Sequence, residues 1–203
     1  MKPLCVAWAF KMTILRALIL IAPLMLAQRI SAEDKRRVTD DGKAITIRST
    51  NIASFTVIGI ETHTSNAKEV TPDGIIGTQW QKFLGEGVLD RIPERIDRNV
   101  YAVYSDYTSD HNGEYSFLIA AKVKDGTTPP TGRVAKQVGA GRYAVFTSEK
   151  GPFAKVVPAV WQKIFHLEDA GTLKRLYLTD FEIYDQRAQD PQNGQVDIYV
   201  GLK

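Results

Sequence analysis

The chain contains an internal repeat, and this repeat restricts the folds that are open to it. Residues 181–185 and 196–201 alternate between apolar and polar side chains like the two strands of a hairpin, and a turn-rich segment separates them. The same arrangement occurs earlier at 101–105 and 115–119. The two hairpins align at an offset of 80 residues, which becomes 81 at the turn. The fold must therefore accommodate two copies of one unit.

Each hairpin is preceded by an amphipathic helix with the same spacing of apolar residues. Positions i, i+4, i+7 and i+8 form one stripe on a helix. They are Ile76, Trp80, Phe83 and Leu84 in the first copy and Val157, Trp161, Ile164 and Phe165 in the second. We place Pro158 in the first turn of the second helix, where proline is tolerated. The chain is thus interpreted as two strand–helix–strand–strand (βαββ) units, which predicts an α+β fold.

One position of the repeat differs in charge between the copies. Glu182 in the second hairpin corresponds to Ala102 in the first, so the scaffold alone does not require an acid there. We interpret Glu182 as a functional residue for this reason. The alternative is a surface acid, or an acid that pairs with Arg187 or Arg142.

The N-terminal residues have the layout of a secretory signal peptide. Lys2, Lys11 and Arg16 precede an apolar run at 17–27, and small residues close the segment near residue 32. The run of 11 residues is short for a bilayer span, so a cleaved signal at 1–32 is favoured over a retained anchor. A periplasmic or secreted protein, without stable membrane insertion after cleavage, is the expectation.

Removal of this segment changes the charge balance. Residues 1–32 hold four basic and no acidic side chains, so the remaining chain has 22 basic and 23 acidic residues and a formal net charge of −1. No basic field is left to indicate a nucleic acid partner. The single cysteine, Cys5, also lies in this segment, so the remaining chain forms no internal disulfide.

The rest of the chain divides by composition. Residues 33–43 are a charged leader, which we interpret as solvated. A domain follows at 44–203, with a first module at 44–123 and a second at 133–203. The linker between them, 124–132, is rich in glycine and proline. Within the first module, the polar residues from 62 to 69 predict a loop over the sheet.

The order of five motifs resembles a known family. They are FTVIGI at 55–60, YAVYSDY at 101–107, GRYAVF at 141–146, WQKI at 161–164 and DFEIY at 180–184. On these motifs, from about residue 44 to the end, the chain resembles the AraC-type effector-binding, GyrI-like domains. It is most similar to the integron-associated effector-binding proteins.

The resemblance implies a pseudo-twofold pair of βαββ modules, with an antiparallel sheet, two main helices and a ligand cleft between the modules. In such families a buried glutamate among aromatic rings binds lipophilic cations, and Glu182 is the matching acid here. Tyr104, Tyr184, Tyr199 and Trp80 are the candidate walls. The chain departs from the regulators of this family because it lacks a helix-turn-helix domain and carries an export signal.

The candidate walls rest on unequal arguments. Tyr104 and Tyr184 share the strand parity of position 182, whereas Tyr199 rests on parity and cross-strand proximity alone. Trp80 and Trp161 lie on the apolar stripes of their helices, so a core role is the alternative for both. A carboxylate buried among such rings has a raised pKa, and a lipophilic cation supplies the missing countercharge.

Other constellations indicate no further chemistry. His63, His111 and His166 lack the spacing of metal ligands, and the triad-like run at 109–111 is interpreted as a polar turn. We therefore expect neither a metal nor a cofactor. The expected partner is a small amphipathic, cationic ligand, and no nucleic acid. The sequence leaves the oligomeric state open.

Three functions remain open at this point. The first is a binding module for a small amphipathic cation. The second is a hydrolase of small molecules that uses Glu182 as general base or nucleophile, as the resemblance allows, although no second catalytic group is found by spacing. The third is a protein-interaction module.

Overall fold

The structure is a computed structural model that describes residues 34–40 and 43–203, with side chains described from residue 47 onward. Within this range nine strands form one antiparallel sheet. No helix in the same range has the length and apolar content needed to cross a bilayer. The signal peptide expected at 1–32 lies outside the described residues.

The elements follow the order of the repeat. The first copy consists of β2 (Lys43–Ile52), β3 (Phe55–Ser65), α2 (Ile76–Gly85), β4 (Val100–Ser105) and β5 (Glu114–Val123). The second consists of β6 (Val134–Val138), β7 (Gly141–Thr147), α3 (Phe153–Asp169), β8 (Arg175–Tyr184) and β9 (Asp197–Leu202). The remaining elements are β1 (Asp34–Asp40), α1 (Asn66–Glu69) and the short 3-10 helices η1 (Leu89–Arg91) and η2 (Gln186–Ala188).

The strand order is symmetric. The sheet runs β1-β2-β7-β9-β8-β4-β5-β3-β6. The counterparts of β2, β3, β4 and β5 are β6, β7, β8 and β9. If each strand is replaced by its counterpart, the sheet order without β1 becomes the same order read backwards. The edge strand of each copy pairs with the other copy, β2 with β7 and β6 with β3. This arrangement agrees with two βαββ units related by a pseudo-twofold axis, in which the segment before the helix is divided into two strands, β2 and β3 in the first copy and β6 and β7 in the second.

The axis passes through the central pair of strands. In the antiparallel ladder between β4 and β8, Ala102 lies opposite Glu182 and Val100 lies opposite Tyr184. Because residues 102 and 182 are equivalent at the offset of 80, the two copies meet at the position where they differ in charge. Glu182 therefore lies at the centre of the sheet, between the two helices.

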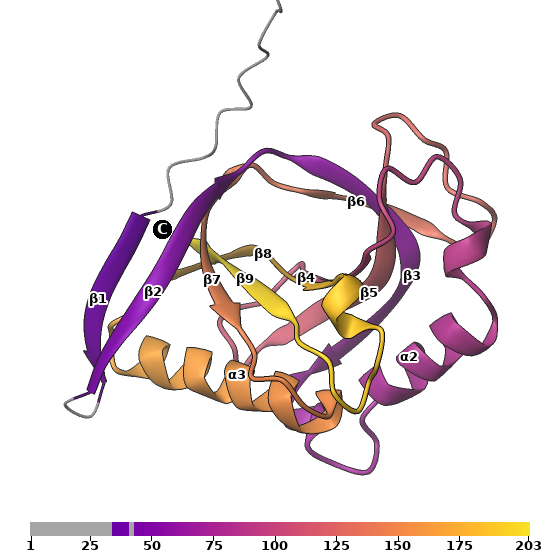
Figure 1. Ribbon diagram of the computed structural model, residues 1–203. Coiled ribbons are helices and arrows are strands. Elements are labelled where there is room, and N and C mark those ends of the chain that lie inside the picture. The colour runs from indigo at the N-terminus through magenta and orange to yellow at the C-terminus, as the bar shows by residue number, and fades with distance from the viewer. Residues whose placement is uncertain (1–33, 41–42) are drawn as a thin grey trace, which may run out of the picture. The chain divides into compact units, whose positions relative to one another are not determined.

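The two faces of the sheet bury different clusters. Both long helices lie on one face (Figure 1), where α2 inserts Phe83 and α3 inserts Ile164 and Leu167. On the opposite face the side chains of the strands pack against one another without helices, around Phe181 and Tyr199. Alternation along β8 assigns Glu182 to the helix face and Phe181 to the other.

Within the charged leader, the backbone of β1 pairs with β2.

Two local predictions were wrong. Residues 62–65 continue β3 rather than forming a loop, because backbone pairing with β5 does not require apolar side chains. Pro158 is the sixth residue of α3 rather than a first-turn residue, because the helix begins earlier, at Phe153. Its ring nitrogen cannot donate the helical hydrogen bond to Ala154.

The packing of Phe181 predicts a large loss of stability on truncation. Phe181 is 1% exposed and stacks on Tyr199 at 4.6 Å between ring centroids. We expect Phe181→Ala to lower the free energy of unfolding by about 3–5 kcal/mol, measured by urea denaturation. Leu178→Ala on the same strand is the matched control, because Leu178 is 66% exposed and its truncation is expected to cost less than about 0.5 kcal/mol. Equal losses in the two variants would contradict this packing.

Candidate functional site

Glu182 is buried at the centre of the helix face. Its exposed fraction is 1%, and it lies opposite Ala102 on β4 and Ile198 on β9. Small and apolar neighbours across both ladders leave room for the carboxylate and give it no charged partner within the sheet. The alternative of a surface acid is thus excluded.

Three neutral groups donate hydrogen bonds to this carboxylate. The Tyr104 hydroxyl donates to Oε1 at 2.8 Å, and the Trp161 indole Nε1–H donates to the same oxygen at 2.7 Å. The Tyr184 hydroxyl donates to Oε2 at 2.6 Å. These donors come from β4, α3 and β8, so both copies of the repeat build the site. The Glu182 carboxylate therefore has hydrogen-bond donors for both oxygens, but these donors carry no positive charge to balance its own.

Burial controls the ionisation of Glu182. It raises the pKa of the carboxyl above its ordinary value of 4.5, while the bonds from Tyr184, Trp161 and Tyr104 oppose the shift. Among the described residues no cation contributes to this pKa or forms an ion pair with Glu182. Arg187, a partner considered from sequence, pairs instead with Asp185 and Asp197. The carboxylate is therefore a buried acid without a countercharge.

Aromatic rings enclose the three donors. The Tyr104 ring lies 5.0 Å from Trp161 in an edge-to-face arrangement, and 5.1 Å from Phe117. The Tyr184 ring lies 4.8 Å from Trp80 and 5.4 Å from Phe153. Edge-to-face pairs of this kind fix ring orientation, so the donor atoms are held toward Glu182.

A cleft of about 580 Å³ lies above this group, between α2 and α3. Its volume is in the range that holds drug-sized ligands. Tyr104 and Trp161, which donate to Glu182, are part of its wall. The other lining side chains include Ile76 and Gly77 of α2, Val157, Pro158 and Phe165 of α3, and Tyr107, His111, Tyr115 and Arg175. The carboxylate thus lies directly behind two ring walls of an aromatic cleft.

The structure separates the residues that the sequence proposed as walls. Tyr104 and Tyr184 both contact Glu182. Trp80 lies one layer behind, packed against Tyr184 outside the cleft lining. Tyr199 does not join the group, because it lies opposite Phe181 in the β8–β9 ladder and stacks on it on the other face of the sheet. Its assignment failed because cross-strand proximity does not bring residues of opposite parity to one face.

Sequence reasoning missed the role of Trp161. Both tryptophans occupy the same position of the helical stripe, so the repeat alone could not rank them. In the structure they differ because Trp161 belongs to the same copy as Glu182 and its indole reaches the carboxylate. A donor on the helix of that copy is the one that reaches the acid.

A second group missed from sequence surrounds Arg175, which lines the same cleft and is 2% exposed. Its Nη2 forms an ion pair with Asp180 at 2.5 Å, and its Nη1 lies 3.4 Å from Glu168. The pKa of Tyr107, which donates to Asp180 at 2.7 Å, is raised well above its ordinary value by burial and by the charge of Asp180. In this part of the cleft the charge of Arg175 is balanced by Asp180 and Glu168, while its buried Nε has no hydrogen-bond partner among the described residues.

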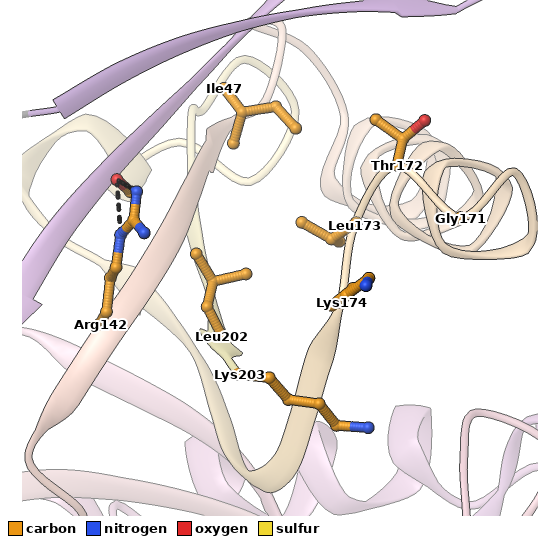
Figure 2. A pocket seen from close by; sticks show the side chains of 9 residues that line it. Ile47, Arg142, Gly171, Thr172, Leu173, Lys174, Leu202 and Lys203 are labelled. Atoms are coloured by element: carbon orange, nitrogen blue, oxygen red, sulfur yellow. Dashed lines mark hydrogen bonds between the residues drawn. The ribbon is translucent and has the colours of Figure 1, made fainter.

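A smaller pocket of about 230 Å³ lies elsewhere, beside β2 and the C-terminal residues (Figure 2). Ile47, Leu173 and Leu202 form its apolar part, and Arg142 borders it with a hydrogen bond to Ser49 at 3.3 Å. It contains none of the ligand-binding residues proposed from sequence. In the described part of the chain, no cluster of His, Cys, Asp or Glu is arranged to hold a metal ion.

Comparisons with curated proteins find two relatives at the same level of identity. YobU of Bacillus subtilis, which carries the name of a transcriptional regulator, is 32% identical over 146 residues, covering 71% of this chain and 90% of YobU. The transcriptional regulator BrlR of Pseudomonas aeruginosa is 32% identical over 151 residues, covering 73% of this chain. The match spans about half of BrlR, 52% of its length.

Solved structures share the fold. An integron cassette protein of Vibrio cholerae superimposes with a TM-score of 0.62 at 28% identity, covering 77% of this chain and 95% of that protein. SAV2435, solved with bound tetraphenylphosphonium, superimposes with a TM-score of 0.64 at 18% identity, covering 78% and 94%.

A comparison with protein families matches residues 50–202 to Cass2, described as integron-associated effector binding protein. The match covers β3 through β9, both long helices and the buried glutamate between them. The chain belongs to the family of integron-associated effector binding proteins.

Proposed function

We propose that this protein binds small lipophilic cations in the cleft between α2 and α3, and that Glu182 supplies the countercharge. The observation that carries the proposal is a buried carboxylate directly behind the walls of an aromatic cleft, with three neutral donors and no paired cation among residues 47–203. Burying such a group without a countercharge is costly, and a ligand cation offsets that cost. SAV2435, which shares the fold, was solved with a lipophilic cation bound.

The walls strengthen the attraction. A cation over the rings of Tyr104 and Trp161 gains cation–π energy of about 0.5–2 kcal/mol for each desolvated contact. Both rings donate hydrogen bonds to the carboxylate, which increases the electron density of their faces. A neutral ligand of the same shape gains the burial of apolar area but neither electrostatic contribution.

The hydrolase alternative is less well supported by the same geometry. A general base or nucleophile needs access to water or to the substrate. The Glu182 oxygens already accept three hydrogen bonds, and the residue is almost completely buried. The arrangement favours charge complementarity over turnover.

Glu182→Gln tests the electrostatic part of the proposal. The amide oxygen can accept from Tyr104 and Trp161, and the amide nitrogen can donate to the Tyr184 hydroxyl, so the packing is retained. We expect at least about tenfold weaker binding of tetraphenylphosphonium, or about 1.4 kcal/mol, measured by isothermal titration calorimetry. Affinity for neutral triphenylphosphine oxide should change little.

A matched pair of tryptophan variants provides the control. Trp161→Phe removes the indole donor from the cleft wall, whereas Trp80→Phe changes a ring that lies behind Tyr184. Only the first substitution is expected to weaken tetraphenylphosphonium binding. Equal affinity of the parent and Glu182→Gln for the cation would rule out a role for the carboxylate.

The raised pKa of Glu182 predicts opposite effects of pH on binding and on stability. Cation binding needs the ionised carboxylate, so affinity should rise as pH increases from about 4.5 through the raised pKa, with proton release. For folding, the pKa of Glu182 in the folded state is above its unfolded value, so protonation of Glu182 stabilises the folded protein. This contribution to the free energy of unfolding is complete below pH 4.5 and is lost as pH rises through the folded-state pKa. Titration and denaturation across this window should show both trends in the parent and neither in Glu182→Gln.

We also propose that the protein acts outside the cytoplasm. The support is the basic and apolar pattern of residues 1–32. Expression of the full chain in a bacterium, followed by cell fractionation and N-terminal sequencing, should recover a processed chain that starts near Glu33 in the periplasm or medium. A full-length chain retained in the cytoplasm would contradict export, and processing without release from the membrane would favour an anchor.

A further inference from the structure

The helix face of β8 carries two buried carboxylates. Asp180 and Glu182 are two positions apart and therefore point to the same side of the sheet. Asp180 is 0% exposed, and Glu182 is nearly as deeply buried. Each therefore requires compensation for the loss of water.

The two carboxylates are compensated differently. Asp180 forms an ion pair with Arg175 and accepts hydrogen bonds from the Tyr107 hydroxyl at 2.7 Å and from the Gly201 amide at 2.8 Å. Glu182 accepts only from neutral donors. Thus, among the side chains that the structure describes, a cation pairs with Asp180 but none pairs with Glu182.

The guanidinium of Arg175 lies among aromatic rings, as the cation of a bound ligand would. The guanidinium carbon lies 4.3 Å from the centroid of the Tyr177 ring, and 5.6–5.8 Å from the rings of Trp161, Tyr107 and Phe165. These distances are in the range of cation–π contacts. Trp161 also donates to Glu182, so a single ring is shared between the filled cation site and the unfilled one.

An irregularity in β8 puts Arg175 on this face. In a regular strand Arg175 and Asp180, five positions apart, would point to opposite faces. A register shift between them leaves Arg175 opposite Leu202 and Asp180 opposite Val200, so both face the helices. Tyr177, within the shift, has φ of 56°, which is unfavourable for a residue with a side chain. The backbone therefore accepts strain at the point where Arg175 is turned into the cleft.

We infer that Arg175 fills a second cation site of the cleft, the one beside Asp180, and thereby keeps a second positive charge of a ligand out of that site. This inference rests on the proposed function. A second cationic group that approached Asp180 would need the space among Tyr107, Tyr177 and Trp161 that the guanidinium occupies. Removal of Arg175 leaves Asp180 and Glu168 without this cation, which converts the filled position into a vacant cation site.

The test uses two ligands of one shape that differ by one charge. They are the dication para-xylylene bis(trimethylammonium) and the monocation in which one ammonium nitrogen is replaced by carbon, a neopentyl group. Calorimetric titration of the parent is expected to show at least about tenfold tighter binding of the monocation, because the site beside Asp180 already holds the positive charge of Arg175, which repels a second one. In Arg175→Gln this preference should narrow by at least about tenfold or reverse.

Two control variants separate charge from packing. Arg175→Lys keeps a cation beside Asp180 and should keep the preference for the monocation. Arg175→Gln combined with Asp180→Asn removes both charges and should lose the gain in dication binding. If Arg175→Gln shows no cooperative thermal unfolding, the inference is tested only by the ratio of the two affinities, monocation to dication, in the parent. A parent that binds the dication as tightly as the monocation overturns the inference.

The outcomes distinguish this inference from the proposed function. If the parent binds the monocation and a folded Arg175→Gln has the same ratio of monocation to dication affinity, only the role of Arg175 is overturned. A parent that binds neither this monocation nor tetraphenylphosphonium overturns the proposed function, and the inference falls with it.

Discussion

The burial of the Glu182 carboxylate is the constraint on which the rest of the site depends. A charge at the centre of a sheet, under two helices, is tolerated only if its hydrogen bonds are made. Tyr104, Trp161 and Tyr184 make them from three different elements. The rings that carry these donors also form or support the cleft wall, so the same side chains satisfy the acid and shape the binding space.

The symmetric scaffold explains why the acid lies between the helices. A pseudo-twofold axis through the β4–β8 ladder brings equivalent residues face to face, so a charge in both copies would place two buried carboxylates against each other. Ala102 opposite Glu182 avoids this repulsion and leaves room for the larger side chain. A single acidic site on the axis therefore requires that the two copies carry different residues at this position.

Charge compensation varies along the floor of the cleft. Asp180 and Glu168 share Arg175, while Glu182 depends on neutral donors. Trp161 lies between the two environments, with its indole N–H toward Glu182 and its ring near the guanidinium.

The sequence by itself determined the repeat, the two helices, the two hairpins and the choice of Glu182 with Tyr104 and Tyr184. The helices, the hairpins and the two tyrosines follow from periodicity, because side chains on a regular strand or helix point in directions that spacing fixes. The choice of Glu182 follows from the comparison of the copies, because the equivalent residue is Ala102. Only the tertiary structure decided between Trp161 and Trp80, placed Tyr199 on the far face and turned Arg175 into the cleft. Helix stripes do not say which ring reaches across to a strand, and a bulge in β8 breaks the period-two rule at Arg175. Contacts between elements and departures from regular geometry are set by the packing of the whole sheet.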